Sequence, residues 1–200
     1  FGGETAATCF IMACMEFARE QTNRGFGYGI LTLMVLGTVL GGLLQNAVST
    51  VMPAIMADMH VTVGTAQWLV TIFQLCLGVV IPLVAFLVRR FSIKWLYIVS
   101  MVLFTVGTFQ VAAAPSFEVL FCGRILEGIG AGIMFPLIQV VVFQNYPRNR
   151  WATIMGFVGL AFGFAPNIGP TIAGICTQYW GWRSMFWGVA IGSVVLSLLM

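Results

Sequence analysis

Charged residues are scarce in this sequence: its 200 residues include nine Lys or Arg, six Asp or Glu and one His. So few charges cannot cover the surface of a soluble globular domain of this length, and the mean hydropathy of +1.01 lies far above that class. The net charge of +3 is too small and too scattered to form a nucleic-acid interface. We therefore expect an integral membrane protein that binds no nucleic acid.

Clusters of metal-ligating or catalytic residues are also missing. The five cysteines form no CxxC pair and have no companion histidines, because the single His60 falls in an expected loop. The apolar segments contain no His/Asp/Glu cluster and no Ser/His pairing. The sequence thus predicts no metal, no cofactor and no catalytic residue, which disfavours a membrane-embedded enzyme.

Long apolar runs make up most of the chain. Each is close to the roughly 20 residues that cross a bilayer as a helix. We expect a tail over residues 1–27 and a transmembrane bundle over residues 28–200. The predicted spans are residues 28–50, 66–88, 95–113, 117–143, 153–176 and 183–200. Because the last run reaches the final residue without a loop, we expect a truncated sixth span in a piece of a longer protein.

The basic residues predict the orientation of the bundle. Seven of them fall on one side of the predicted membrane: Arg19, Arg24, Arg89, Arg90, Lys94, Arg148 and Arg150. The opposite side has only Arg183. The excess places the N-terminus in the cytoplasm. The break after residue 50 is marked by Pro53, Asp58 and His60.

Small and polar residues recur every three or four positions in the first two spans, which places them along one side of each helix. The first span has Gly37, Gly41, Gln45 and Ser49, with Asn46 beside them, and the second has Gln67, Thr71, Gln74 and Gly78. Such residues either let helices approach closely or line an aqueous cavity. The amides favour the cavity, since burying them without a partner is unfavourable.

Two charged residues lie inside the fourth span. Arg124 and Glu127 are three residues apart and hence on nearly the same helix face. A charge at the centre of a span is unfavourable by at least about 2.5 kcal/mol on insertion scales. The pair either neutralises itself and pins the helix, or Glu127 carries protons under the opposing influences of burial and Arg124.

Helix-breaking residues cluster in the fifth span. They follow one another at intervals of three or four: Gly156, Gly159, Gly163, Pro166, Pro170 and Gly174. The prolines remove backbone donors, and such helices survive in a membrane only where protein or water satisfies the freed carbonyls. We expect the prolines to bend the helix and the glycines to let another backbone come near, and a kinked, close-packed helix of this kind suits a seal between two halves of a moving transporter.

These motifs resemble one family. GLAFGFAPNIGPTIAG, from Gly159 and including Gly169, looks like the fifth-helix antiporter motif of the major facilitator superfamily, and LFCGRILEGIGAG resembles its fourth-helix motif. The stretch from Leu43, LLQNAVSTVMPAIMADMHVTVGTAQWLVTIFQL, looks like the first two helices of the fourteen-helix drug:proton antiporters, especially the lincomycin-resistance-like members.

The chain departs from the family pattern at two places. In AFLVRRFSIKWL, Ala85, Arg89 and Ser92 replace the usual Gly, Asp and Gly of the loop that follows the second helix. The first helix carries neutral Gln45 and Asn46 where many members have an acid. Glu127 therefore becomes the main candidate for carrying protons.

The resemblance implies the N-terminal six-helix bundle of such a transporter, built from two inverted three-helix repeats. The expected function is multidrug efflux: proton-coupled export of lipophilic or amphipathic compounds across a bacterial cytoplasmic (inner) membrane. The expected partners are the lipid bilayer, the small lipophilic substrates and the C-terminal half of the transporter. Phe73 and Phe135 are candidate contacts for flat drugs. Two alternatives stay open: an uptake symporter or facilitator on the same fold, and a non-transporting membrane module.

Overall fold

The computed structural model describes residues 28–199, with side chains from residue 32 onward, and the expected tail over residues 1–27 lies outside the described residues. Within that range the chain forms six helices and no strand, which confirms the all-helical prediction. They are α2 (Tyr28–Met59), α3 (Val63–Arg90), α4 (Ile93–Ala112), α5 (Phe117–Asn145), α6 (Arg148–Trp180) and α7 (Trp182–Leu198). Five are long and apolar enough to cross a membrane, and α7 is a shorter apolar helix of 17 residues.

The helix α2 continues past the expected break at Pro53, which lies inside it. A proline removes one helical hydrogen bond, and this loss is tolerated where the helix is supported by neighbours. The chain turns only at His60, whose φ of 52° is left-handed. The next helix is then capped by Thr62, whose hydroxyl accepts a hydrogen bond from the Thr65 amide at 3.4 Å.

Other helices also extend beyond the apolar runs that predicted them. The helix α6 covers residues 148–180, whereas the apolar run covers residues 153–176. Polar residues at a membrane surface continue a helix without contributing to hydropathy, so composition alone places such ends too far inward.

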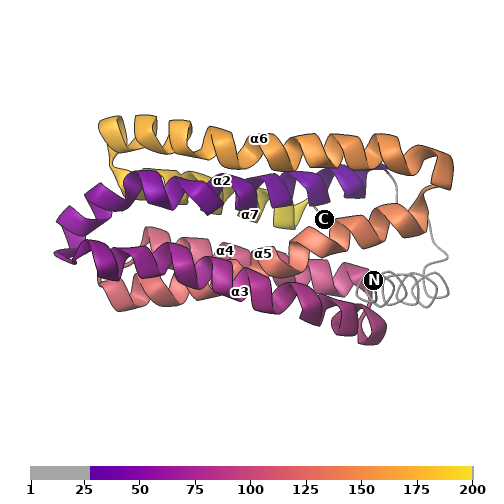
Figure 1. Cartoon of the computed structure of the whole chain (residues 1–200), viewed down its shortest axis with the longest axis horizontal. Coiled ribbons are helices and arrows are strands. Elements are labelled where there is room, and N and C mark those ends of the chain that lie inside the picture. The colour runs from indigo at the N-terminus through magenta and orange to yellow at the C-terminus, as the bar shows by residue number, and fades with distance from the viewer. Residues whose placement is uncertain (1–27, 200) are drawn as a thin grey trace, which may run out of the picture.

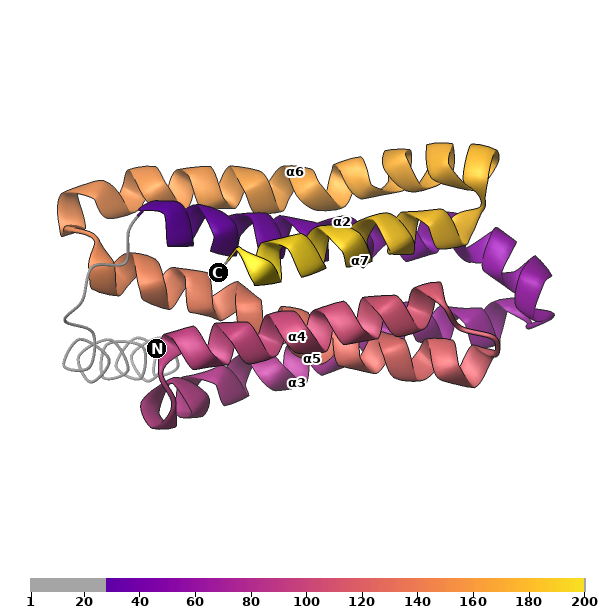
Figure 2. The ribbon, with the colours of Figure 1, turned by 180° about the vertical axis from the view of Figure 1, so that it is seen from behind.

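The helices form two layers, with α2, α6 and α7 in one and α3, α4 and α5 in the other (Figures 1 and 2). Across the bundle, α2 packs on α6 in the way that α5 packs on α3. In each case the first helix of one three-helix unit packs on the second helix of the other unit, as expected for two related repeats. Seen from behind, α4 and α7 lie side by side and in contact (Figure 2).

Burial is uneven among the helices. In α5, 61% of the most apolar window is buried, against 22% in α3 and 17% in α6. The helix α5 therefore forms the centre of the bundle, while α3 and α6 leave most of their surface uncovered by the described residues. Arg124 and Glu127, which are fully buried, both lie on this central helix.

A polar link joins α2 to α7 at the end of the bundle that carries the α2–α3 turn. Asp58 Oδ2 accepts hydrogen bonds from Arg183 Nη2 at 3.1 Å and from Trp182 Nε1 at 3.3 Å. Trp182 is almost fully buried, whereas Asp58 and Arg183 remain partly exposed. The link connects the first described helix to the last at a solvent-facing end.

Candidate functional site

The Arg124–Glu127 pair is the buried ionic site of the described bundle. Arg124 Nη1 donates to Glu127 Oε2 at 2.5 Å, and both side chains have no exposed surface. The two residues lie well inside α5, more than one turn from either end, which places the pair at bilayer depth when the helix spans the membrane. Charges in this position are rare and face the interior of a bundle, which makes the pair the candidate functional site.

The helix α3 holds the guanidinium of Arg124. The Nε donates to the Leu69 carbonyl at 3.3 Å, and the guanidinium carbon lies 4.3 Å from the centroid of the Phe73 ring. Phe73 is fully buried, so the expectation that it touches substrate is wrong in the described structure. The face of its ring instead stabilises the cation.

On the other side, α4 lies directly against Glu127. A Cβ at Gly107 would lie 2.7 Å from the Glu127 amide nitrogen and 3.0 Å from its Cγ, so only glycine allows this approach. Thr108 also lies beside the carboxylate. Its hydroxyl donates to the Phe104 carbonyl at 2.8 Å, so that proton is already used within α4.

The pair leaves two polar atoms without a protein hydrogen-bond partner: Arg124 Nη2 and Glu127 Oε1. A buried carboxylate oxygen that accepts no hydrogen bond is unfavourable. A proton added at Oε1 would remove the negative charge and supply a donor at the same atom. The same proton would leave the buried Arg124 guanidinium without its counter-charge, so the energetic effect on the pair combines both changes.

The expected stripe on α2 divides into a packing part and an exposed part. Gly37 lies against Tyr97 and Met101 of α4, whereas Ser49 is exposed. Steps of four residues turn a helix by about 40° beyond a full turn, so the stripe drifts from the interior to the surface. Gln45 is half-buried. The glycine at the start of the stripe packs against α4, and the exposure of the polar residues increases towards Ser49.

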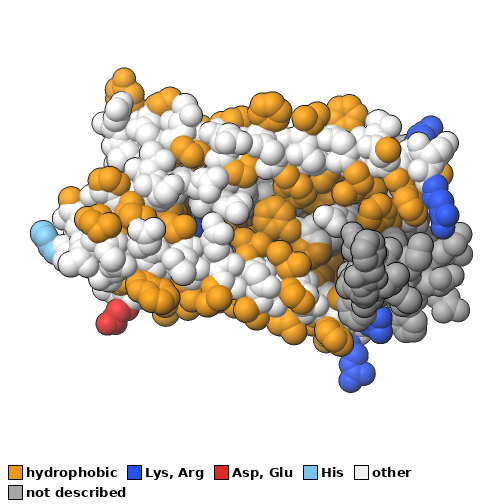
Figure 3. All heavy atoms as spheres, in the orientation of Figure 1, with side chains coloured by type: hydrophobic (Ala, Val, Ile, Leu, Met, Phe, Trp, Pro, Cys, Tyr) orange, Lys and Arg blue, Asp and Glu red, His pale blue; other side chains and the backbone are white. Residues whose placement is uncertain are grey.

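Polar residues of α3 and of the following turn are exposed. This applies to Gln67, Thr71, Gln74, Arg90 and Lys94, and Arg89 is exposed as well. Basic side chains appear at the end of the molecule that carries the α3–α4 and α5–α6 turns, whereas the His side chain lies at the opposite end (Figure 3). The assignments of the amides to a cavity and of the basic loop to the cytoplasm stay predictions.

The glycines of α6 differ in their surroundings. A Cβ at Gly169 would overlap the Leu43 carbonyl oxygen of α2, so the two backbones touch there. Gly156, Gly159, Gly163 and Gly174 have nothing within 4 Å of an added Cβ. Among the described residues Gly169 is thus the glycine of α6 that brings another backbone close, and close packing of the other four glycines stays a prediction.

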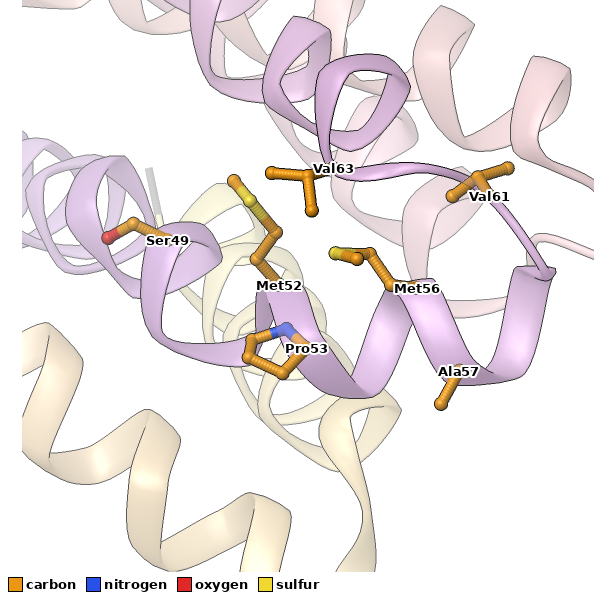
Figure 4. Close-up of a pocket in the computed structure, with 7 residues that line it drawn as sticks. All are labelled: Ser49, Met52, Pro53, Met56, Ala57, Val61 and Val63. Carbon is orange, nitrogen blue, oxygen red and sulfur yellow. The ribbon is translucent and has the colours of Figure 1, made fainter.

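Two features near the exposed surfaces go beyond what the sequence indicated. Phe135 of α5, a predicted solute contact, packs with Phe162 of α6 at a ring-centroid distance of 5.0 Å, and each ring is only partly buried. An open groove lies where α2 meets the start of α3, and there Met52 and Met56 point towards Val63 (Figure 4). The feature of the sequence that could have indicated this groove is the pair Met52 and Met56, which lie four residues apart and hence on one face of a helix.

The groove in Figure 4 shares no residue with the Arg124–Glu127 site. Its lining is almost wholly apolar, with Ser49 as the exception. No group of His, Cys, Asp and Glu among the described residues could hold a metal ion.

Comparisons with known proteins agree with this geometry. The chain is 40% identical over 186 residues to the MFS-type transporter YcnB of Bacillus subtilis, covering 91% of this chain and 39% of that protein. It is 32% identical to the lincomycin resistance protein LmrB of the same organism, covering 85% of this chain and 35% of LmrB. It is also 32% identical to the multidrug export protein EmrB of Haemophilus influenzae, covering 84% of this chain and 34% of EmrB. The chain thus spans less than two fifths of these relatives.

A solved structure shows the same arrangement of helices. The sulfate-bound mutant of the peptide transporter POT superposes with a TM-score of 0.75 at 15% sequence identity, covering 93% of this chain and 40% of that one. At this identity the likeness establishes the fold alone. The family description of the Major Facilitator Superfamily matches residues 34–200. With its six-helix bundle and its transporter relatives, this chain belongs to the Major Facilitator Superfamily.

Proposed function

We propose that the protein containing this chain is a proton-coupled antiporter that exports lipophilic or amphipathic drugs across a bacterial cytoplasmic membrane. One observation carries the proton coupling: Glu127 is fully buried in the central helix, paired with Arg124, and retains one oxygen without a protein partner. Of the acidic side chains that the structure describes, Asp58 and Glu118 are exposed near helix ends, so Glu127 is the described acid at bilayer depth.

The surroundings of the pair suggest how a proton could alter the structure. Arg124 joins α5 to α3 through the Leu69 carbonyl and the Phe73 ring. Protonation of Glu127 would remove the charge that holds Arg124 Nη1, and the guanidinium would be retained by α3 alone. Because Arg124 and Glu127 lie on the same helix, the proton would act on the α3–α5 contact only through Arg124, and a link of this kind is what coupling proton movement to a conformational change requires.

The names of the relatives support export and the class of cargo, since they include lincomycin resistance and multidrug export proteins. The paired rings of Phe135 and Phe162 offer a surface for flat apolar solutes. The rest of the transporter would complete the solute site, because such sites lie between two bundles at the midplane. The basic residues of the α3–α4 turn favour an N-terminus in the cytoplasm.

Accumulation of ethidium in cells that express the complete protein tests this function. Export predicts less cellular ethidium than in cells without the protein, and a protonophore should abolish the difference. Higher accumulation would instead indicate the uptake symporter or facilitator. Equal accumulation of ethidium and of lincomycin would contradict export and favour a non-transporting module.

A further inference from the structure

The helix α6 contains a carbonyl that it cannot satisfy by itself. In an α-helix the carbonyl of residue 166 accepts from the amide of residue 170, but Pro170 has no N–H. The helix nevertheless continues unbroken from Arg148 to Trp180. At bilayer depth the Pro166 carbonyl then needs a donor from elsewhere in the protein or from water in a cavity.

A side chain of α2 supplies this donor. Asn46 Nδ2 lies 3.4 Å from the Pro166 carbonyl oxygen, and the two residues are 120 positions apart in the sequence. Asn46 lies near the middle of α2, and Pro166 lies near the middle of α6. The hydrogen bond therefore joins the two helices at about half their length.

Close backbone contact surrounds this hydrogen bond. A Cβ at Gly42 would lie 3.1 Å from Ala165 Cβ and 3.7 Å from Pro166 Cδ, and one at Gly169 would overlap the Leu43 carbonyl oxygen. Gly42 and Asn46 are one turn apart on α2. The crossing of α2 and α6 thus holds the Asn46 amide opposite the turn of α6 that runs from Pro166 to Pro170.

We propose that Asn46 is a positioning residue of the transport cycle: its amide takes the place of the N–H that Pro170 lacks and fixes the proline-containing middle of α6 against α2. The remaining surface of Asn46 is exposed, and its own backbone carbonyl accepts from the Ser49 hydroxyl at 2.5 Å. Movement of α6 away from α2 then has to break this one bond and expose a carbonyl. The role in transport rests on the proposed function, whereas the structural role does not.

A double-mutant cycle between Asn46 and Pro170 tests the proposal. Asn46→Ala removes the donor, and Pro170→Ala restores a backbone N–H for the Pro166 carbonyl. In the complete transporter, Asn46→Ala should lower the maximal rate of ethidium efflux roughly three- to fifteenfold, the range that interhelical hydrogen bonds support, and leave KM within about twofold. In the Pro170→Ala background the same change should alter the rate by less than about twofold.

Two further variants separate donor loss from other effects. Asn46→Leu keeps the approximate size, removes the donor and adds no ionisable group, so it should impair efflux as much as Asn46→Ala. Asn167→Ala is the matched control, because Asn167 Nδ2 donates to the Gly163 carbonyl at 2.5 Å and that carbonyl also accepts from a backbone amide of the same helix. Its effect should be the same whether residue 170 is proline or alanine.

The outcomes that would overturn the proposal are distinct. Equal effects of Asn46→Ala in both backgrounds would show that the amide does not serve the Pro166 carbonyl. An increase in KM in proportion to the loss would show that Asn46 binds solute instead. The same cycle measured on the thermal unfolding midpoint of the purified transporter needs no transport, so it remains decisive even if the export function is wrong.

Discussion

Arg124 Nη1 and Glu127 Oε2 lie 2.5 Å apart, and no part of either side chain is exposed, although less than half of a transporter of this family surrounds them. The pair is enclosed by α3 and α4 of its own bundle rather than lying open on the surface of α5. A proton can therefore reach Glu127 only if these helices move or a narrow path opens. This relationship is the basis of the first two predictions.

Glu127→Gln should abolish proton-driven efflux and leave the amount of protein in the membrane unchanged. The amide keeps the size of the carboxyl group and can still accept a hydrogen bond from Arg124, but it cannot bind or release a proton near neutral pH. The measurement is ethidium transport in inside-out vesicles after a pH gradient is imposed. Glu118→Gln, at the exposed start of α5, is the control and should transport normally. Normal pumping by the Glu127→Gln variant would refute the coupling role.

Arg124→Lys should reduce the rate of ethidium efflux at least about fivefold even though the charge is kept. A single ammonium group cannot reproduce both the hydrogen bond to Glu127 and the planar stack on Phe73 with a donor to the Leu69 carbonyl. Arg183→Lys, at the exposed link to Asp58, offers a matched substitution with little expected effect. Equal rates for both variants would show that the guanidinium geometry is unimportant.

Gly107→Ala should destabilise the bundle by about 1–3 kcal/mol, the usual effect of overpacking a tight contact. The added methyl group would meet the Glu127 amide nitrogen and the Gly123 carbonyl oxygen, at 2.7 and 2.8 Å, and neither backbone can rotate away. A Cβ at Gly188 meets no described residue within 4 Å, and alanine has the higher helix propensity, so Gly188→Ala should be neutral or stabilising. Thermal unfolding of the purified protein compares the two, and similar midpoints would contradict the close α4–α5 contact.

Gly169→Ala should change the stability of the protein, whereas Gly163→Ala should change only its transport activity. The first places a methyl group on the Leu43 carbonyl and should lower the unfolding temperature, because α6 is pushed from α2. The second meets nothing in the described part of the chain, so any effect should be on transport through contacts with the remainder of the transporter. Both quantities are measured on the complete protein. Loss of stability in Gly163→Ala alone would reverse this assignment.

Asp58→Ala should lower stability by no more than about 1 kcal/mol, because a partly exposed ion pair contributes little. The effect should shrink in high salt, where the attraction to Arg183 is screened. Asp58→Asn retains an acceptor for Trp182 Nε1 and should be milder still. Chemical denaturation at two salt concentrations measures both variants. A large loss that does not depend on salt would show that the link is not mainly electrostatic.

The sequence was sufficient for the fold because hydropathy reports directly on burial in lipid. It located the six helices and the charged pair, since an arginine and a glutamate inside an apolar run have no ordinary explanation. It did not give the helix ends: Pro53 lies within a helix, and α6 extends into polar residues. These ends depend on local hydrogen bonding, which composition does not report.

The contacts between residues on different helices were the least predictable part of the site. Phe73 could not be distinguished from a solute-facing aromatic, because its ring lies against a guanidinium 51 positions away on another helix. The glycines of α6 form one pattern in sequence but two environments in space. The bond from Asn46 to Pro166 joins residues whose pairing depends on how α2 crosses α6.

The three-residue spacing of Arg124 and Glu127 also bears on biogenesis. Two opposite charges on adjacent turns of one helix can pair as soon as that helix forms, before any later helix has left the ribosome. The translocon would then receive a nearly neutral segment instead of two separate ions, which eases its passage into lipid. A carboxylate whose counter-charge came from a different helix would have to enter the membrane unpaired and wait for its partner.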